Sequence, residues 1–312
     1  MGSVRIDTLA QRFRTADASD KMRLARPAVY IAVLSVSFSA ILVRLTDASG
    51  LAVAFYRMFF SSLLMIPVYM LQRPRLPSLR SPELRLCILS GLFLGFHFAT
   101  WITSLKFTSV ASSVTLVTTQ PLFVAALSSL FLGERLSKSA VAGMGLAILG
   151  SAALVFQGMA IGSMHLAGDL LALAGAAFAS GYLILGRLVR RSLRVESYAL
   201  VAYVTSAVTI GLVCAVLSPE ALIVSGRDLA ITCAMALVCT IIGHTLFNWS
   251  LEFVSASFVA VMILGEPVGA SLWAALLFRE IPTAVQAAAC CALLAGILVF
   301  ARGEAAHSGK TQ

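Results

Sequence analysis

Apolar residues run along this chain in long, nearly uninterrupted stretches, and polar residues gather in the short segments between them. A helix needs about 17 to 25 apolar residues to cross the hydrocarbon of a membrane. Only helices fit such runs, because a backbone in lipid must satisfy its hydrogen bonds within the segment. The pattern predicts ten transmembrane helices, at 27–46, 51–72, 84–107, 109–132, 139–157, 168–189, 196–217, 228–251, 255–278 and 283–301.

Composition supports a membrane protein. Hydrophobic residues make up 59% of the chain and charged residues only 12%, with a mean hydropathy of +0.94. A soluble domain has roughly twice that share of charge, so lipid must be the solvent for most of this surface. The six cysteines lie inside apolar runs, without the paired spacing of a zinc site or a disulfide framework. We therefore expect neither a metal nor another cofactor.

Basic residues predict how the helices are oriented. With a cytoplasmic N-terminus, the cytoplasmic side receives most of the 23 Lys and Arg residues, as the positive-inside rule requires. The exceptions are Arg44, Arg57, Lys106, Arg227 and Arg279. We expect a multi-pass protein of the cell membrane with two cytoplasmic tails, 1–26 and 302–312. The net charge of +9 forms no continuous basic face, so no nucleic-acid partner is expected.

The chain also repeats itself at a shift of 146 residues. Identical residues in register are Leu105 and Leu251, Phe107 and Phe253, Pro121 and Pro267, Glu134 and Glu280, and Gly150 and Gly296. The two repeats, 27–157 and 168–301, contain five predicted helices each. Because five is odd, the repeats must be inserted in opposite orientations. Inverted repeats are typical of secondary transporters, in which the halves exchange conformations and so move a cavity between the two sides.

Three strings carry a resemblance to a known family: SFSAILVRL…AFYRM, TTQPLFVAALSSLFLGERLS and GEPVGASLWAALLFREIPT. They resemble the EamA-type members of the drug/metabolite transporter superfamily, over nearly all of 27–301. The resemblance implies an all-α fold of ten transmembrane helices, arranged as two inverted five-helix repeats around a central cavity. It also implies export of amino acids or other small metabolites. The first helix reads Ser35-Val-Ser-Phe-Ser39 where this family often has Trp-Gly, so the resemblance does not identify the substrate.

Polar side chains inside the predicted spans are candidates for substrate binding, because charges there are costly. Glu266 is the only carboxylate well inside a predicted span, and it precedes Pro267, which cannot continue the hydrogen bonding of a helix. Glu266 could bind an amino group, carry a proton, or pack neutral between helices. Its counterpart in the first repeat is Gln120, beside Pro121, which could contact a ligand or hydrogen-bond to a neighbouring helix.

Two histidines occupy roughly matching places in the two repeats. His97 and His244 each precede a tryptophan, Trp101 or Trp249, and residues four apart share a helix face. Beside a cavity, these rings would suit an amphipathic or aromatic substrate. The tryptophans could instead anchor their helices at the membrane interface. Asn248, with four hydrogen bonds to satisfy, belongs to the same group.

The second and fourth predicted helices supply the remaining candidates. Arg57, next to Tyr56, could bind an anion, but we expect it to snorkel towards the nearer water layer. Thr115 and Thr119 would suit a polar cavity wall, although threonine also bonds to its own backbone. We assign structural or gating roles to Pro121, Pro267 and Arg57. The expected substrate-binding residues are Glu266, His97, His244, Asn248, Gln120, Trp101, Tyr56 and Thr119.

These features predict a secondary transporter that exports amino acids or related small metabolites by alternating access, with Glu266 or the histidines available for proton coupling. An importing or facilitative carrier for amines, choline-like cations or nucleotides is the alternative, followed by a channel. The chain has neither HExxH nor a nucleotide-binding loop, so it is not expected to be an enzyme or an ATP-driven pump. Small residues spaced by four fit either packing within a monomer or contact in a homodimer.

Overall fold

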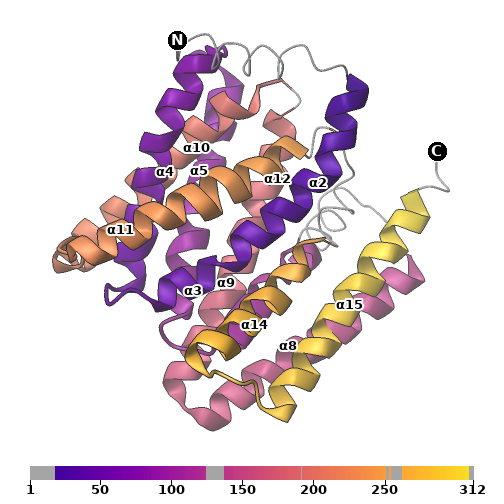
Figure 1. Ribbon diagram of the computed structural model, residues 1–312. Coiled ribbons are helices and arrows are strands. Elements are labelled where there is room, and N and C mark those ends of the chain that lie inside the picture. The colour runs from indigo at the N-terminus through magenta and orange to yellow at the C-terminus, as the bar shows by residue number, and fades with distance from the viewer. Residues whose placement is uncertain (1–17, 124–136, 191, 251–252, 254–261, 309–312) are drawn as a thin grey trace.

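The computed structural model describes residues 18–123, 137–190, 192–250, 253 and 262–308 (Figure 1). Regular secondary structure in these ranges is entirely helical. The first repeat contains α2 (Ala18–Ser37), α3 (Ser39–Arg44), α4 (Gly50–Gln72), α5 (Pro82–Ser104), α6 (Val110–Val117) and α8 (Lys138–Ile161). The second contains α9 (Ser163–Val189), α10 (Val195–Leu217), η1 (Pro219–Leu222), α11 (Gly226–Met235), η2 (Ala236–His244), α12 (Thr245–Ser250), α14 (Gly265–Phe278) and α15 (Ala284–Ser308).

Eight segments of the described residues are long and apolar enough to cross a membrane. They are Pro27–Arg44, Gly50–Gln72, Pro82–Ser104, Lys138–Ile161, Ser163–Gly186, Val195–Leu217, Gly226–Ser250 and Ala284–Gly303. The predicted fourth and ninth spans lie partly outside the described residues, and α6 and α14 are the main helices in their described parts. The protein is therefore an all-helical, multi-pass membrane protein, and the count of ten spans stays a prediction.

Helices are interrupted at related places in the two repeats. A turn at Thr118 and Thr119 ends α6 before Pro121, and a turn at Leu264 precedes α14 and Pro267. Each proline lacks the N–H that would bond to the preceding turn, which favours such an interruption. The first span is broken as well, at Phe38, between α2 and α3.

The last helix of each repeat packs against the other, and this pair stands beside the main bundle (Figure 1). A β-carbon at Gly143 of α8 would collide with the backbone at Gly296 of α15, and one at Gly150 would collide with the backbone at Ala289. Residue numbers rise along α8 as they fall along α15, so the two helices are antiparallel. Small residues along the contact let the backbones approach closely.

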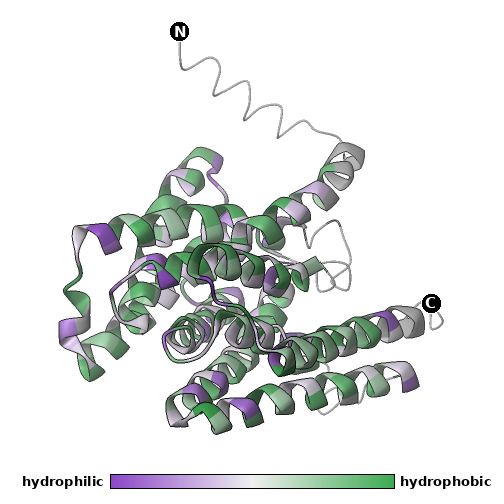
Figure 2. Ribbon diagram, turned by 60° about the horizontal axis from the view of Figure 1, so that its bottom comes forward, coloured by the Kyte–Doolittle hydropathy of each residue, from purple (hydrophilic) through white to green (hydrophobic). Residues whose placement is uncertain are grey.

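The largest buried cluster lies in the main bundle, where α5 packs against α4, α9 and α10. Gly91 meets Ala202 and Gly95 meets Ser206, so α5 and α10 run in the same direction. Hydrophobic residues cover the lengths of the helices, while hydrophilic residues gather near their ends and connections (Figure 2).

Polar contacts mark the two ends of the bundle. At the end that we call the Arg44 end, Arg44, Lys106, Asp228 and Glu280 lie at helix termini. At the opposite Arg194 end, Arg194 Nη2 donates to Gln72 Oε1 at 3.4 Å. A single residue, Gly162, joins α8 to α9 at the Arg44 end, and its φ of 152° is readily adopted only by glycine.

Candidate functional site

Arg57 is 0% exposed and lies two turns inside α4. Its Nε donates to Thr240 Oγ1 at 3.0 Å, and its Nη1 donates to Ser39 Oγ at 2.7 Å. The guanidinium carbon sits 4.2 Å from the centre of the Phe98 ring, which is a favourable cation–π contact. Nη2 has no hydrogen-bond partner among the described residues. The group therefore retains a buried donor that an anion can use.

Two irregular helical segments bring the hydroxyl groups to Arg57. Ser39 is the first residue of α3, directly after the break at Phe38. Thr240 lies in η2, a π-helical stretch between α11 and α12. π-Helical turns are rare and often occur at functional sites, because they change where side chains point. Both irregular segments thus place a hydroxyl acceptor beside the same buried charge.

Both predicted histidines lie beside the Phe98 ring. His97 stacks on Trp101 with ring centres 5.8 Å apart, and its Nδ1 lies 2.9 Å from the carbonyl oxygen of Gly175. His244 packs against Phe98 in a T-shaped arrangement, with ring centres 5.5 Å apart. The Phe98 ring therefore contacts both Arg57 and His244. We call Arg57, His97, Phe98, Trp101, His244 and Glu266 the Arg57 cluster.

Glu266 is half-buried in the first turn of α14. It lies close enough to Arg57 for the two charges to interact. Among the described residues, however, Glu266 forms no ion pair. The cluster thus contains a guanidinium group and a carboxyl group that are near one another but form no direct ion pair.

Three buried tyrosines that were not predicted from the sequence lie beside this cluster. The predicted Asn248 donates through Nδ2 to the Tyr182 hydroxyl at 2.9 Å, and Tyr182 stacks on Tyr198 with ring centres 6.1 Å apart. The Tyr203 hydroxyl lies 3.1 Å from Thr245 Oγ1. A tyrosine inside a predicted span is a clue that the sequence offers, because a buried phenol hydroxyl needs a hydrogen-bond partner.

Three predicted residues make their contacts outside the Arg57 cluster. The Tyr56 hydroxyl donates at 2.6 Å to a carbonyl in the connection between α10 and α11. The main-chain oxygen of Gln120 accepts from Ser180 Oγ at 2.9 Å. The Thr119 hydroxyl donates at 2.7 Å to the carbonyl of Leu116 in the last turn of α6, and such a bond to the nearby backbone is common for threonine.

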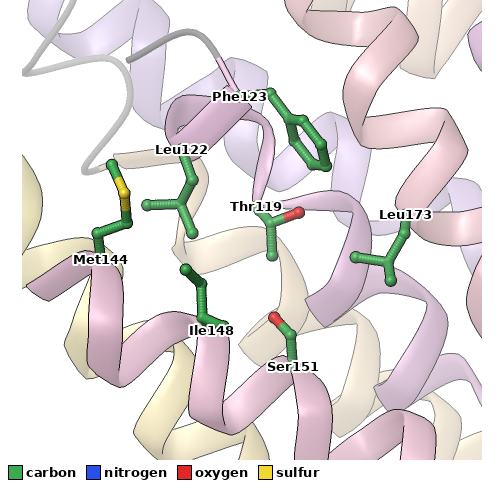
Figure 3. A pocket seen from close by; sticks show the side chains of 7 residues that line it. All are labelled: Thr119, Leu122, Phe123, Met144, Ile148, Ser151 and Leu173. Carbon is green, nitrogen blue, oxygen red and sulfur yellow. The ribbon is translucent and has the colours of Figure 1, made fainter. Parts of the chain in front are cut away.

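Thr119 also lines a separate pocket of about 230 Å³ between the end of α6, α8 and α9 (Figure 3). Its lining residues are Thr119, Leu122, Phe123, Met144, Ile148, Ser151 and Leu173. Two hydroxyls are the only polar side-chain groups in this set, so the pocket offers no charge to a polar substrate. The Arg57 cluster is the better candidate site.

Three interpretations of the sequence are wrong. Arg57 does not snorkel, because it is buried and bonded to two hydroxyls. Trp101 is 3% exposed, so it is a core residue rather than an interfacial anchor. Glu266 is not the only carboxylate well inside a span. The helix predicted from residue 168 begins at Ser163, and this places Asp169 within it, completely buried.

Comparison with known proteins identifies the family. A profile described as the EamA-like transporter family matches residues 26–156 and again residues 166–302. One solved structure, titled only "Crystal structure of protein", superposes with a TM-score of 0.61 over 89% of this chain and 97% of that chain. Its sequence identity is 19%, so this likeness shows the fold alone. No curated protein matches the chain.

The family profile matches twice, once in each repeat, and together the two matches cover most of the sequence. Members of this family are membrane transporters rather than enzymes. The chain belongs to the EamA-like transporter family of the drug/metabolite transporter superfamily.

Proposed function

We propose that this transporter exports amino acids or related small zwitterions by alternating access, and that it binds them between Arg57 and Glu266. One observation carries the proposal: Arg57 is fully buried, and its Nη2 has no partner among the described residues. A buried charge is costly unless hydrogen bonds replace its lost hydration. A substrate carboxylate supplies the acceptor that Nη2 lacks, through a charge-assisted hydrogen bond.

Glu266 is the partner for the ammonium group of the substrate in this proposal. If Glu266 and Arg57 formed a direct ion pair, each would satisfy the other and neither would need a ligand. They interact electrostatically but form no such pair among the described residues. A zwitterion between them gives each charge a partner, with its carboxylate at Arg57 and its ammonium group at Glu266. A choline-like cation would leave Arg57 unsatisfied.

Helix directions support the inversion that alternating access requires. In two inverted halves, the last helices must run antiparallel, as α8 and α15 do. The third helix of the first half must run parallel to the second helix of the second half, as α5 and α10 do. In this proposal the Arg194 end and both chain termini face the cytoplasm, because most basic residues lie on that side.

Ligand-induced stabilisation of the purified protein tests the proposed substrate class. We expect amino acids to raise the unfolding temperature in detergent, because a ligand that binds the folded state stabilises it. Amines without a carboxylate and carboxylates without an amine should have much smaller effects. Arg57→Lys should abolish the stabilisation, because an ammonium group cannot reproduce the geometry of the guanidinium.

Tyr56→Phe is the matched control in the same helix, since the Tyr56 hydroxyl bonds to a carbonyl outside the cluster. This variant should respond to amino acids as the wild type does. Equal stabilisation by a simple amine, or undiminished stabilisation of Arg57→Lys by amino acids, would contradict the proposed site.

A further inference from the structure

Asp169 is a completely buried carboxylate outside the Arg57 cluster. It lies nearly two turns inside α9 and is 0% exposed. Its Oδ1 accepts hydrogen bonds from Thr108 Oγ1 at 2.7 Å and from Ser112 Oγ at 2.8 Å. Its Oδ2 has no partner among the described residues. An anion with one buried, unsatisfied oxygen is costly.

The space around Oδ2 suits a proton better than a metal ion. Oδ2 faces Gly158 of α8, where a β-carbon would collide with it. Hard metal ions take several oxygen ligands, whereas the two hydroxyls that the described residues bring to Asp169 already donate to Oδ1. A proton on Oδ2 needs no further ligand and removes the buried charge.

Thr108 connects Asp169 to the contacts that join the two repeats at the Arg44 end. The main-chain oxygen of Thr108 accepts from Arg44 Nη2 at 2.6 Å. Arg44 Nη2 also lies 3.5 Å from Glu280 Oε2, and Glu280 Oε1 accepts from the Val110 N–H at 2.6 Å. The hydroxyl of Thr108 thus contacts Asp169, while its carbonyl contacts the ion pair between the repeats.

The titratable group nearest to Asp169 on its own helix is His165. It interacts electrostatically with Asp169, lies one turn closer to the Arg44 end and is half-buried. His165 is therefore the titratable side chain of α9 that lies between Asp169 and this end. Lys106 lies two residues before Thr108. Burial lowers the pKa of its ammonium group most, and the nearby charge of Arg44 lowers it further.

The helices packed against α9 bring few other titratable groups towards Asp169. α6 has none, and α8 has Lys138 at its far end. The titratable residues of α5 all lie further towards the Arg194 end, and the nearest of them, His97, bonds to α9 at Gly175. Arg44 and Glu280 do not contact Asp169 directly, because Thr108 lies between Asp169 and their ion pair.

We propose that Asp169 is a proton-binding site, separate from the substrate site, that couples proton movement to opening of the Arg44 end. As an anion, Asp169 accepts from Thr108 and Ser112 and holds the start of α6 against α9. Binding a proton removes its charge, weakens both bonds and releases the Thr108 carbonyl from its contact with Arg44. The proposal rests on the transport function proposed above and assigns proton coupling to Asp169 rather than to Glu266 or the histidines.

Infrared difference spectroscopy of the protein in lipid vesicles tests the site without a substrate. Acidification should produce carbonyl bands of protonated carboxylic acids, one of them from Asp169. Asp169→Asn should lack that component, whereas Glu266→Gln should keep it. Ser112→Ala retains the carboxyl group and should move the band to higher frequency, so it also serves if Asp169→Asn does not fold. Spectra that neither Asp169→Asn nor Ser112→Ala changes would overturn the assignment.

Transport in proteoliposomes tests the coupling, with an amino acid that stabilises the purified protein. An imposed pH gradient should drive accumulation by the wild type. Asp169→Asn should lose this accumulation but still exchange the amino acid at equal pH. If the wild type exchanges and Asp169→Asn still follows the gradient, the coupling role is wrong and the transport proposal stands. If the wild type does not exchange, the transport proposal fails, and the infrared result still decides the proton site.

Discussion

A guanidinium group inside a membrane protein loses its water, and neighbouring side chains have to replace that hydration. Around Arg57, Thr240 and Ser39 accept from two of the nitrogens, and Phe98 covers the face of the group. The third nitrogen, Nη2, has no hydrogen-bond partner among the described residues. The chemistry of the site therefore depends on a few hydroxyls as much as on the charge itself.

Ser39→Ala should lower the free energy of unfolding by about 1–3 kcal/mol, because Arg57 Nη1 would become a buried donor without an acceptor. Ser62→Ala is the control. The Ser62 hydroxyl donates to a carbonyl of its own helix, and that carbonyl keeps its regular main-chain hydrogen bond when the hydroxyl is removed. Thermal unfolding in detergent compares the two. Equal losses would mean that Ser39 does not support the arginine.

Glu266→Gln should abolish amino-acid transport in proteoliposomes and leave the protein folded. Glutamine has nearly the same shape but cannot balance the charge of a substrate ammonium group. Glu196→Gln is the control, because Glu196 pairs with Arg194 at the Arg194 end. Undiminished flux in Glu266→Gln would remove Glu266 from the mechanism.

Among the helices, length and apolar content were the most predictable properties. The predicted span 51–72 corresponds to Gly50–Gln72, because the thickness of the hydrocarbon sets the length of an apolar run. The start of α9 was misplaced, since Ser163 and His165 interrupt the apolar residues of its first turn. The π-helical segment η2 was not predictable, because its residues are as apolar as those of a regular helix.

The site was harder to predict than the spans. The sequence shows which side chains inside a span are polar, but it does not show what they face. Tyr56 and Arg57 are neighbours, yet adjacent residues point about 100° apart on a helix. Arg57 enters the cluster, whereas Tyr56 bonds to the connection after α10. Asp169 was overlooked because it fell at the edge of a predicted span.

The contact between α8 and α15 gives a prediction at the same scale. Gly143→Leu should destabilise the protein by about 1–3 kcal/mol or prevent folding, because the added side chain meets the backbone of α15. Gly145→Leu, two residues away, has open space around it and should be nearly neutral. Thermal unfolding in detergent again provides the comparison, and similar stability of the two variants would contradict the close packing.

Across the whole molecule, the Arg44 end is held together by contacts between the repeats. Arg227 Nη1 lies 3.1 Å from Asp47 Oδ2, and the main-chain N–H of Asp47 donates to Asp228 Oδ1 at 3.1 Å. Arg44 and Glu280 add a further ion pair. The proposed alternating access requires these contacts to separate during each cycle.

A reversible cross-link tests this separation. Cysteines replacing Asp47 and Arg227, in a background in which the six native cysteines are replaced, should be joined by a short thiol-specific cross-linker. The cross-link should stop amino-acid transport, and a cleavable reagent should allow recovery after reduction. Each single-cysteine variant, treated in the same way, should remain active. Full transport by the cross-linked protein would show that this end does not open.

The central claim is that a zwitterion binds between Arg57 and Glu266 and is carried by exchange of two inverted halves. Counterflow in proteoliposomes tests it most directly. An unlabelled amino acid inside should drive uptake of the labelled amino acid in the wild type, but not in Arg57→Lys. Amines or carboxylates inside should not drive it. Counterflow that is equal for all three classes, or unchanged in Arg57→Lys, would contradict the claim.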